Sequence, residues 1–392
     1  MVTTDAYIAG VYEHPLREAP EKSVMELHAD VAREALSDAG LSKSDVDGFA
    51  TAGVPEYEYG YPGLIMTDYL GLDVSFINTT DVGGASYVSH VGHAADAVTC
   101  GTADVVLITQ AGRPRSSEQK RGTEVDEPVS IQGDFESAYG ATSVTKAALA
   151  ARRHMHEYGT TSRQLAEIRV AAGYHAQYNE HALYQEPVTI EDVVDSKMVA
   201  DPLHLLDCCV VTDGGGAILV VSEEVRDEIE RECVRILGHG ETIKHSDGGR
   251  IDPTYTGAVK SGKSAYDEAG VTPEEIDYAS IYDSFTITAL EIIEDLGFCD
   301  KGEGGAFVEG GTLQAPDGEL PVNTDGGGLA SNHPGNRGGV VKVVEAVRQL
   351  RRETNPPVQA PDPTIAVAHA EGGGSPATRH ASVTLVLGGE AR

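Results

Sequence analysis

The sequence predicts an α/β protein built from two similar halves, and three observations support this prediction. Strand-like and helix-like segments alternate through residues 5–110, as α/β layering requires. The sequence pattern of residues 39–47, which is typical of a helix–turn–strand junction, recurs at 269–277. A glycine pair introduces a helix in each half, at Gly83-Gly84 and at Gly338-Gly339. We therefore predict a duplication, with a site at the junction of the two halves.

The charge of the chain is strongly acidic. Its 392 residues hold 62 acidic and 29 basic side chains, for a formal net charge of −33. Salt screens such self-repulsion, so the composition predicts a protein that works in high salt, as in extreme halophiles. A disordered acidic chain is the alternative, and the periodic apolar segments argue against it. The absence of a basic stripe argues against nucleic acid as a partner.

Cysteine spacing and hydropathy predict the compartment. The five cysteines show no CxxC pair, which argues against a disulfide framework and against a metal site. The first residues lack the basic and apolar regions of a signal peptide, and no apolar run reaches 18 residues. We expect a cytoplasmic protein without a membrane span and without a bound cofactor.

The segments can be assigned along the chain. The strands that we expect are 6–11, 46–52, 74–77, 104–109, 217–221 and 383–387. The helices that we expect are 23–39, 64–70, 85–100, 141–158, 162–178 and 340–351. Residues 111–205 are more polar and predict a lobe inserted over the sheet. The predicted halves are 1–225, with the lobe at about 111–205, and 226–392.

The turn Asn78–Tyr87 leads from a short strand into a helix of small residues, Val88–Val98. Such a helix can lie in the middle of a domain, where its N-terminal N–H groups would face a developing negative charge. Three more Gly-flanked polar segments stand out, and they are 281–286, 323–339 and 369–375.

Together these segments resemble the thiolase superfamily, specifically its sterol-carrier and lipid-transfer branch. Further similarity lies in Lys197–Leu203, in Thr212-Asp213-Gly214 and in 294–305. The resemblance covers nearly the whole chain. It implies a duplicated αβαβα fold of five layers, a loop lobe over an acyl-CoA site and a homodimer. It also makes a small zinc-ribbon/OB-fold partner protein plausible.

The departures from the family concern its two cysteines. Thiolases carry a nucleophilic Cys at the head of the central helix, where this chain has Gly84-Ala85-Ser86. The late Cys that acts as acid and base is also missing, and Ala370–Gly374 occupies its segment. We expect Cys208 and Cys209, which flank a strand, to lie in the core or behind the site.

Five residues remain as catalytic candidates. His333, in an Asn-His-Pro setting, matches the family's histidine and is assigned acid/base or oxyanion duty. Tyr282 matches the proton-transferring tyrosine of related aldolases, and Asp283 would orient it or a water. Glu371 would be a base if burial raises its pKa. Ser86 would be a substitute nucleophile with His333 as its base. Structural roles for each of these residues remain open.

Coenzyme A would enter only as part of the substrate. The backbone N–H groups of Gly84 and Gly374, with His333, would hold the thioester oxyanion. The phosphates of coenzyme A need local positive charge. The densest basic cluster in the sequence consists of Arg113, Arg115, Lys120 and Arg121. A solvated loop is the alternative for this cluster.

The absence of cysteine separates two chemistries. Claisen cleavage needs an enzyme nucleophile that carries the acyl group, whereas retro-aldol cleavage of a 3-hydroxyacyl-CoA does not. We therefore predict a cysteine-independent (retro-)aldolase. A β-ketothiolase or acetyl-CoA acyltransferase that uses Ser86 is one alternative. A non-catalytic acyl-CoA or lipid-binding subunit is the other.

Overall fold

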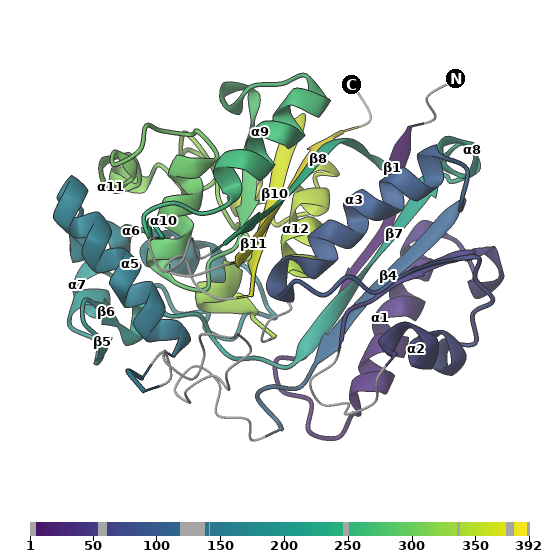
Figure 1. Cartoon of the computed structure of the whole chain (residues 1–392), viewed down its shortest axis with the longest axis horizontal. Helices are drawn as coiled ribbons and strands as arrows, with labels where there is room; N and C mark the ends of the chain where they lie inside the picture. Colours follow the sequence, from purple (N-terminus) through teal and green to yellow (C-terminus); the bar gives the residue numbers. More distant parts are fainter. Residues whose placement is uncertain are drawn as a thin grey trace.

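The computed structural model describes residues 5–53, 61–117, 138–140, 142–245, 251–334, 338–373 and 380–389. Strands and helices alternate along these residues (Figure 1). The strands are β1 Ala6–Glu13, β2 Gly48–Ala50, β3 Phe76–Asn78, β4 Val105–Gly112, β5 Met198–Ala200, β6 Leu203–His204, β7 Gly214–Ser222, β8 Val234–Lys244, β9 Tyr278–Ile281, β10 Ile365–Gly372 and β11 His380–Gly388.

The helices among the same residues are α1 Val24–Ala39, α2 Pro62–Leu70, α3 Ser86–Thr99, α5 Ser143–Tyr158, α6 Ser162–Ala176, α7 Ile190–Val194, α8 Glu223–Arg226, α9 Ala258–Ala269, α10 Thr286–Asp295, α11 Gly304–Phe307 and α12 Gly339–Leu350. Short 3₁₀ turns add to these, and residues Gly327–Ser331 form a single π-helical turn. No helix among the described residues is long and apolar enough to cross a membrane.

Helix α1 shows how the local sequence sets the elements. The Ser23 hydroxyl accepts a hydrogen bond from the Glu26 N–H, and the Glu26 side chain accepts one from the Ser23 N–H. This capping box fixes the start of the helix. Gly40 ends it in a left-handed conformation, with φ at 71°. The prediction of a helix that begins at Ser23 and stops at Gly40 is confirmed.

The main sheet of the described residues is mixed, with nine strands in the order β3-β2-β4-β7-β1-β8-β11-β10-β9, and β5 and β6 form a separate two-stranded sheet. The order is mirrored about the β1–β8 junction, because β1-β7-β4-β2 on one side corresponds to β8-β11-β10-β9 on the other. At the junction, Tyr7 pairs with Arg235 and Ile8 with Val234. The duplicated α/β arrangement that the sequence predicts is confirmed, whereas the domain boundary at 225/226 stays a prediction.

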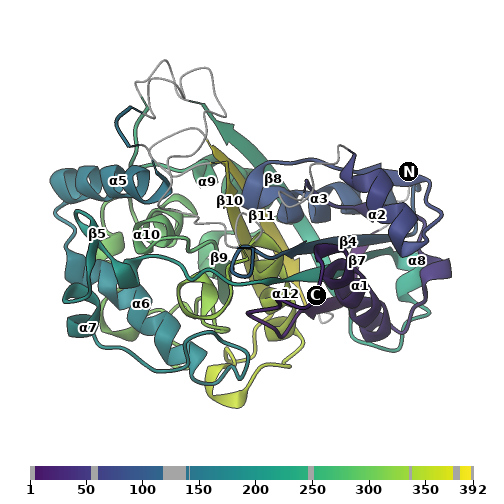
Figure 2. The same cartoon turned by 90° about the horizontal axis from the view of Figure 1, so that it is seen from below.

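The helices form layers around this sheet (Figures 1 and 2). Helix α1 packs on β1, β7 and β4, while α9 packs on β8 and β11. The small-residue helix α3 touches strands of both mirrored sets, and α12 packs against it. The described part of the lobe, with α5, α6 and α7, lies beside α10. The N-termini of the two central helices are therefore enclosed.

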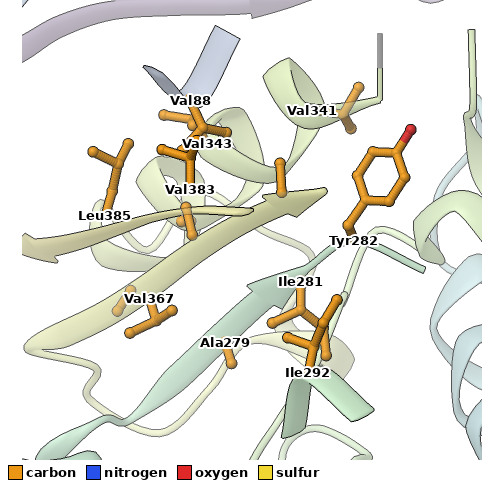
Figure 3. Close-up of a cluster of buried hydrophobic side chains, with 14 of the residues drawn as sticks. Val88, Ala279, Ile281, Tyr282, Ile292, Val341, Val343, Val367, Val383 and Leu385 are labelled. Atoms are coloured by element: carbon orange, nitrogen blue, oxygen red, sulfur yellow. The ribbon is translucent and has the colours of Figure 1, made fainter. Parts of the chain in front are cut away.

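The core extends to the end of β9. Buried side chains from β9, β10, β11, α3, α10 and α12 form one apolar cluster, which includes Ile281, Ile292 and Val367. Figure 3 shows Tyr282 directly after β9, with its ring extending past this cluster and its hydroxyl pointing away from Ile281 and Ile292. Strand β9 thus places the Tyr282 hydroxyl at the edge of the apolar core.

Candidate functional site

The central helix α3 begins at a tightly packed turn. Gly83 adopts a left-handed φ of 72°, and its N–H donates to Asp81 Oδ1 over 3.1 Å. The end of β10 presses on this turn, since an ideal Cβ on Gly372 would lie 1.7 Å from the Val82 carbonyl oxygen. Only glycine fits such a close approach of two backbones.

Gly84, which the sequence resemblance matches to the family's nucleophile, has no room for a side chain. An ideal Cβ there would lie 2.5 Å from the Tyr282 hydroxyl and 2.5 Å from the Glu371 carbonyl oxygen. The tyrosine hydroxyl therefore occupies the space into which a residue at this position would project.

Tyr282 and His333 form the central pair of the site. The Tyr282 hydroxyl lies 3.0 Å from His333 Nε2, and the two rings meet edge to face at 5.4 Å. Tyr282 is only 6% exposed, and burial raises its pKa well above the ordinary value of 10, with further contributions from the nearby Cys209, Asp283 and Glu371 groups. The phenol therefore stays protonated at neutral pH and can donate to the His333 ring nitrogen. The structure brings together two predicted catalytic residues.

His333 is held by its backbone. Its N–H donates to Thr212 Oγ1 over 3.0 Å, and the Thr212 N–H donates back to its carbonyl over 3.3 Å. Thr212 in turn donates to Asn332 Oδ1, whose amide group donates to the buried Glu13 carboxylate. Our reasoning from the sequence missed Asn332 and Glu13, although Asn332 belongs to the same Asn-His-Pro motif.

The second central helix also begins at this pair. An ideal Cβ on Gly338 would lie 3.2 Å from both the His333 ring and the Tyr282 ring. A Cβ on Gly339 would lie 2.2 Å from the Gly84 carbonyl oxygen. The N-termini of α3 and α12 therefore converge on the tyrosine hydroxyl, and both helix dipoles favour negative charge there.

Asp283 faces the scaffold. Its buried carboxylate lies 2.7 Å from Lys342 Nζ and accepts hydrogen bonds from the N–H groups of Gly328 and Leu329. None of these contacts is with the Tyr282 hydroxyl, so the described geometry ties Asp283 to the π-helical turn. Our sequence reasoning missed Lys342, although a lysine within the valine-rich run of α12 was a signal for a buried partner.

Glu371 points along the sheet. Its Oε1 accepts from Ser382 Oγ over 2.7 Å and lies 3.0 Å from His369 Nε2. His369 is joined through its other ring nitrogen to Thr384 on the neighbouring strand β11. The backbone carbonyl of Glu371 reaches Gly84, while its carboxylate belongs to this network. Its role as a base stays a prediction.

Ser86 caps the turn. Its hydroxyl donates to the Gly83 carbonyl over 2.7 Å and accepts from the Val82 N–H over 2.9 Å. The side chain is fully buried, and none of its contacts among the described residues is with His333. Its observed role is to fix the helix start.

The predicted phosphate-binding cluster is engaged at its described end. Arg113 donates to the Pro20 carbonyl. Arg115 donates to Glu18 and to the Val211 carbonyl. Arg121 and Lys120, like Gly374 of the predicted oxyanion hole, lie outside the described residues. Coenzyme A binding by this cluster stays a prediction.

Three of the cysteines lie in settings that suppress the thiolate. Burial raises the pKa of Cys208 and of Cys299 to about 12, and it raises that of Cys209, near Tyr282, even further. These three groups are therefore neutral thiols at pH 7. No cluster of three or more His, Cys, Asp or Glu side chains suited to a metal ion occurs in the part of the chain that the structure describes.

Comparison with known proteins places this geometry in a family. A family model described as thiolase C-terminal domain-like matches residues 240–388. The chain is 32% identical to the 17-hydroxy-3-oxo-4-pregnene-20-carboxyl-CoA lyase of Mycobacterium tuberculosis, with 94% of this chain and 97% of the relative covered. It is 33% identical to an acetyl-CoA acetyltransferase of Methanothermobacter thermautotrophicus, with 89% and 91% covered.

Solved structures agree with these relatives. The structure described as Ltp2-ChsH2(DUF35) aldolase superposes with a TM-score of 0.85 at 31% identity, covering 99% of this chain and 98% of that one. Human mitochondrial 3-ketoacyl-CoA thiolase superposes with a TM-score of 0.72 at 14% identity over the full length of both chains, which shows the shared fold. This chain thus belongs to the thiolase superfamily, in the branch that contains the sterol-carrier-like thiolases and the side-chain-cleaving aldolases.

Proposed function

We propose that the protein is a cysteine-independent retro-aldolase that cleaves 3-hydroxyacyl-CoA thioesters. One observation carries the proposal. The Tyr282 hydroxyl fills the space at Gly84 where a thiolase nucleophile would stand, and it lies 3.0 Å from His333 Nε2. The site thus offers proton transfer in place of a covalent acyl carrier. The lyase of Mycobacterium tuberculosis and a steroid side-chain-cleaving aldolase of Thermomonospora curvata are relatives with lyase or aldolase names.

The pair supports a proton relay. The substrate's 3-hydroxyl gives its proton to the Tyr282 oxygen while the Tyr282 proton passes to His333 Nε2. The O–H electron pair forms the new carbonyl, the C2–C3 bond breaks, and its electrons form the thioester enolate. Tyr282 then protonates C2 and recovers its proton from His333. The products are an aldehyde or ketone and a shortened acyl-CoA, with no net proton change.

The helix N-termini would stabilise the enolate. The turn that contains Gly84 begins α3, and α12 begins beside it at Gly338-Gly339. Backbone N–H groups at helix starts point toward negative charge and need no reorganisation during the reaction. We assign the thioester oxygen to Gly84 N–H, with Gly374 N–H as the predicted second donor.

The described residues of the site offer no free nucleophile for the competing thiolysis. Acetyl-CoA acetyltransferases are among the relatives, so the family alone does not decide the reaction. Ser86 donates its proton to the Gly83 carbonyl, and the buried thiols near the site are held neutral. The geometry therefore favours aldol chemistry over acyl transfer.

Aldehyde release from a 3-hydroxyacyl-CoA tests the proposal. We expect Tyr282→Phe and His333→Ala each to lower kcat/KM by about 10³-fold, which is within the range of general acid–base catalysis. Ser86→Ala should leave it unchanged. Tyr278→Phe is a matched control, because this buried tyrosine at the start of β9 bonds to Thr324 and lies outside the relay.

Mass spectrometry after incubation with acetyl-CoA is the complementary test. The retro-aldolase predicts no acetylated protein. Acetylation that disappears in Ser86→Ala would establish the ketothiolase reaction and refute the proposal. Thioester binding without either reaction would leave a binding subunit as the function.

We further propose a small zinc-ribbon/OB-fold partner protein. The superposed aldolase structure is described as a complex of Ltp2 with ChsH2(DUF35), and the superposition covers nearly all of this chain. Cleavage assays should therefore be run with the chain alone and with such a protein from the same source. A rise in kcat on addition would support the partnership.

We also propose a homodimer through the free edge of the sheet. Strand β3 ends the sheet order, and large apolar side chains are exposed on it and on the adjacent α2: Tyr61, Leu64, Tyr69 and Ile77. An exposed apolar strand edge is a template for pairing with another chain, and large apolar patches mark interaction sites. Ile77→Lys should convert the dimer to a monomer in light scattering. The high salt that we infer from the net charge of −33 sets the buffer for these assays.

A further inference from the structure

Arg169 is a buried cation without a protein partner among the described residues. It lies in the middle of α6 and is 1% exposed. Its Nε and Nη1 atoms are inaccessible and make no hydrogen bond in the described part of the chain. A buried guanidinium with unused donors costs free energy, and proteins compensate such a cost when a ligand supplies the missing acceptors.

The helix provides room for this guanidinium. Gly173 follows Arg169 by one turn on the same face of α6. An ideal Cβ on Gly173 would lie 2.8 Å from Arg169 Nη1, so any side chain there would push the guanidinium aside. Gly173 has no positive φ, so its backbone conformation does not require glycine. The missing side chain instead leaves space for the Arg169 guanidinium. Arg169 and Gly173 therefore act as a pair.

No ion pair among the described residues neutralises this charge. The groups whose charges act on Arg169 are the Tyr184 hydroxyl and the Asp283 carboxylate, and neither forms an ion pair with it. Asp283 is already satisfied by Lys342 and two backbone N–H groups. Burial lowers the pKa of Arg169 to about 10, so the guanidinium remains charged at neutral pH.

The position of Arg169 links it to the reacting centre. Helix α6 packs on the π-helical turn Gly327–Ser331, which leads directly into His333. The Tyr184 N–H donates to the Ala330 carbonyl of the same turn. Asp283, within electrostatic reach of Arg169, follows Tyr282 in the chain. The guanidinium thus lies on the lobe side of the proposed catalytic loop.

We propose that Arg169 recognises a carboxylate on the acyl chain of the substrate, so that the enzyme prefers acyl-CoA thioesters that carry a second, free carboxyl group. The proposal rests on the acyl-CoA site of the proposed function. A guanidinium matches a carboxylate through two parallel hydrogen bonds. Its deep burial favours an acyl group over the surface-bound phosphates of coenzyme A. On a protein of net charge −33, attraction of an anion requires such a local cation.

Equilibrium binding tests this inference without requiring catalysis. The probes are dicarboxylic acyl-CoA thioesters (glutaryl-, adipyl- and suberyl-CoA), each compared by calorimetry with the monocarboxylic thioester of equal carbon number. None carries a 3-hydroxyl, so a failure of the retro-aldol proposal does not affect the result. The native enzyme should bind at least one dicarboxylic thioester roughly 10- to 100-fold more tightly than its partner.

Variants of α6 test whether the preference for dicarboxylic thioesters depends on Arg169. Arg169→Met should abolish it, and Gly173→Ala, which displaces the guanidinium without removing its charge, should reduce it. Arg163→Met is the matched control, because Arg163 lies on the same helix, exposed and paired with Glu191. The control should keep the preference in full.

Three results would overturn the inference. The first is an equal affinity of the native enzyme for both thioesters at every length, or a preference that survives Arg169→Met. The second is an equal loss of affinity for both thioesters in Arg169→Met, which would assign Arg169 to a coenzyme A phosphate. The third is a fall in the Tm of the unliganded Arg169→Met protein. Removal of an unpaired buried charge should raise that Tm by roughly 2 °C, whereas loss of a structural contact would lower it.

Discussion

Tyr282 and Asp283 are neighbours in the chain, yet they serve opposite sides of the site. Tyr282 lies in an apolar setting, with its hydroxyl against Gly84 and His333. Asp283 is surrounded by donors, which are Lys342 and the N–H groups of the π-helical turn. Among the described residues, the Tyr282 hydroxyl has one hydrogen-bond partner, which is the His333 ring. The Asp283 carboxylate is held by an ion pair and two backbone hydrogen bonds.

The difference separates proton transfer from stability. A group that moves a proton must keep a partner that can accept it, and the Tyr282–His333 pair meets this condition. A buried ion pair with additional hydrogen bonds stabilises the fold only while it stays complete. Substitutions on the Tyr282 side should therefore reduce activity, and substitutions on the Asp283 side should reduce stability.

Gly84→Ala should give the largest effect on the catalytic side. The new Cβ would lie 2.5 Å from the Tyr282 hydroxyl, so the phenol must move away from His333. We expect kcat/KM for 3-hydroxyacyl-CoA cleavage to fall by about 10³-fold. Steady-state kinetics on the purified variant measure this loss.

A double variant sharpens the result. Gly84→Ala combined with Tyr282→Phe should be no worse than Tyr282→Phe alone, because both changes disable the same relay. Full additivity of the two losses would mean that Gly84 acts independently of Tyr282. It would contradict the claim that Gly84 makes room for the Tyr282 hydroxyl.

The fold follows closely from local sequence signals. Helix α1 begins after the capping residue Ser23 and ends before Gly40, as predicted. The glycine pairs mark the starts of α3 and α12. These features depend on residues near one another in the chain, which is why they can be predicted. The long strand β8 was not predicted, because its polar residues interrupt the apolar pattern.

The site follows from the sequence only in part. The importance of Gly84, Tyr282 and His333 was predicted, but not that the tyrosine hydroxyl fills the empty space at Gly84. The ion pair of Asp283 with Lys342 joins residues that are 59 positions apart. Such pairings depend on the packing of β9 against α12, which periodicity does not encode.

Lys342→Met tests the scaffold side. The change leaves the buried Asp283 carboxylate without its counter-charge, and we expect the free energy of unfolding to fall by roughly 3–5 kcal/mol. Urea unfolding measures this loss. Asp283→Asn in the same chain should recover part of it. Activity per folded molecule should fall far less than in Tyr282→Phe, and an equal fall would contradict the separation.

Acid distinguishes the scaffold from the site in another way. Burial lowers the pKa of His90 and of His175 to about 4 from 6.5, so the unfolded chain binds protons more readily than the folded one between these values. Stability is therefore complete above pH 6.5 and is lost as the pH falls toward 4, by roughly 2–3 kcal/mol per histidine.

The pH dependence of urea midpoints checks this expectation. His90→Leu should flatten the profile by one histidine's share. It should also lower stability at pH 7, since the ring nitrogen lies 2.9 Å from the Thr80 carbonyl. An unchanged acid slope in His90→Leu would show that this ring is not the group that titrates.

Ser86→Ala should give the smallest effect and completes the comparison at the helix start. The hydroxyl ties the Val82 N–H to the Gly83 carbonyl, so its removal should cost about 1 kcal/mol of stability. Cleavage activity should stay within about twofold of the native value, because the Gly84 backbone and the Tyr282–His333 pair remain. A loss of activity as large as that of Tyr282→Phe would make Ser86 part of the chemistry. The separation between a residue that shapes the turn and residues that move the proton would then fail at this helix.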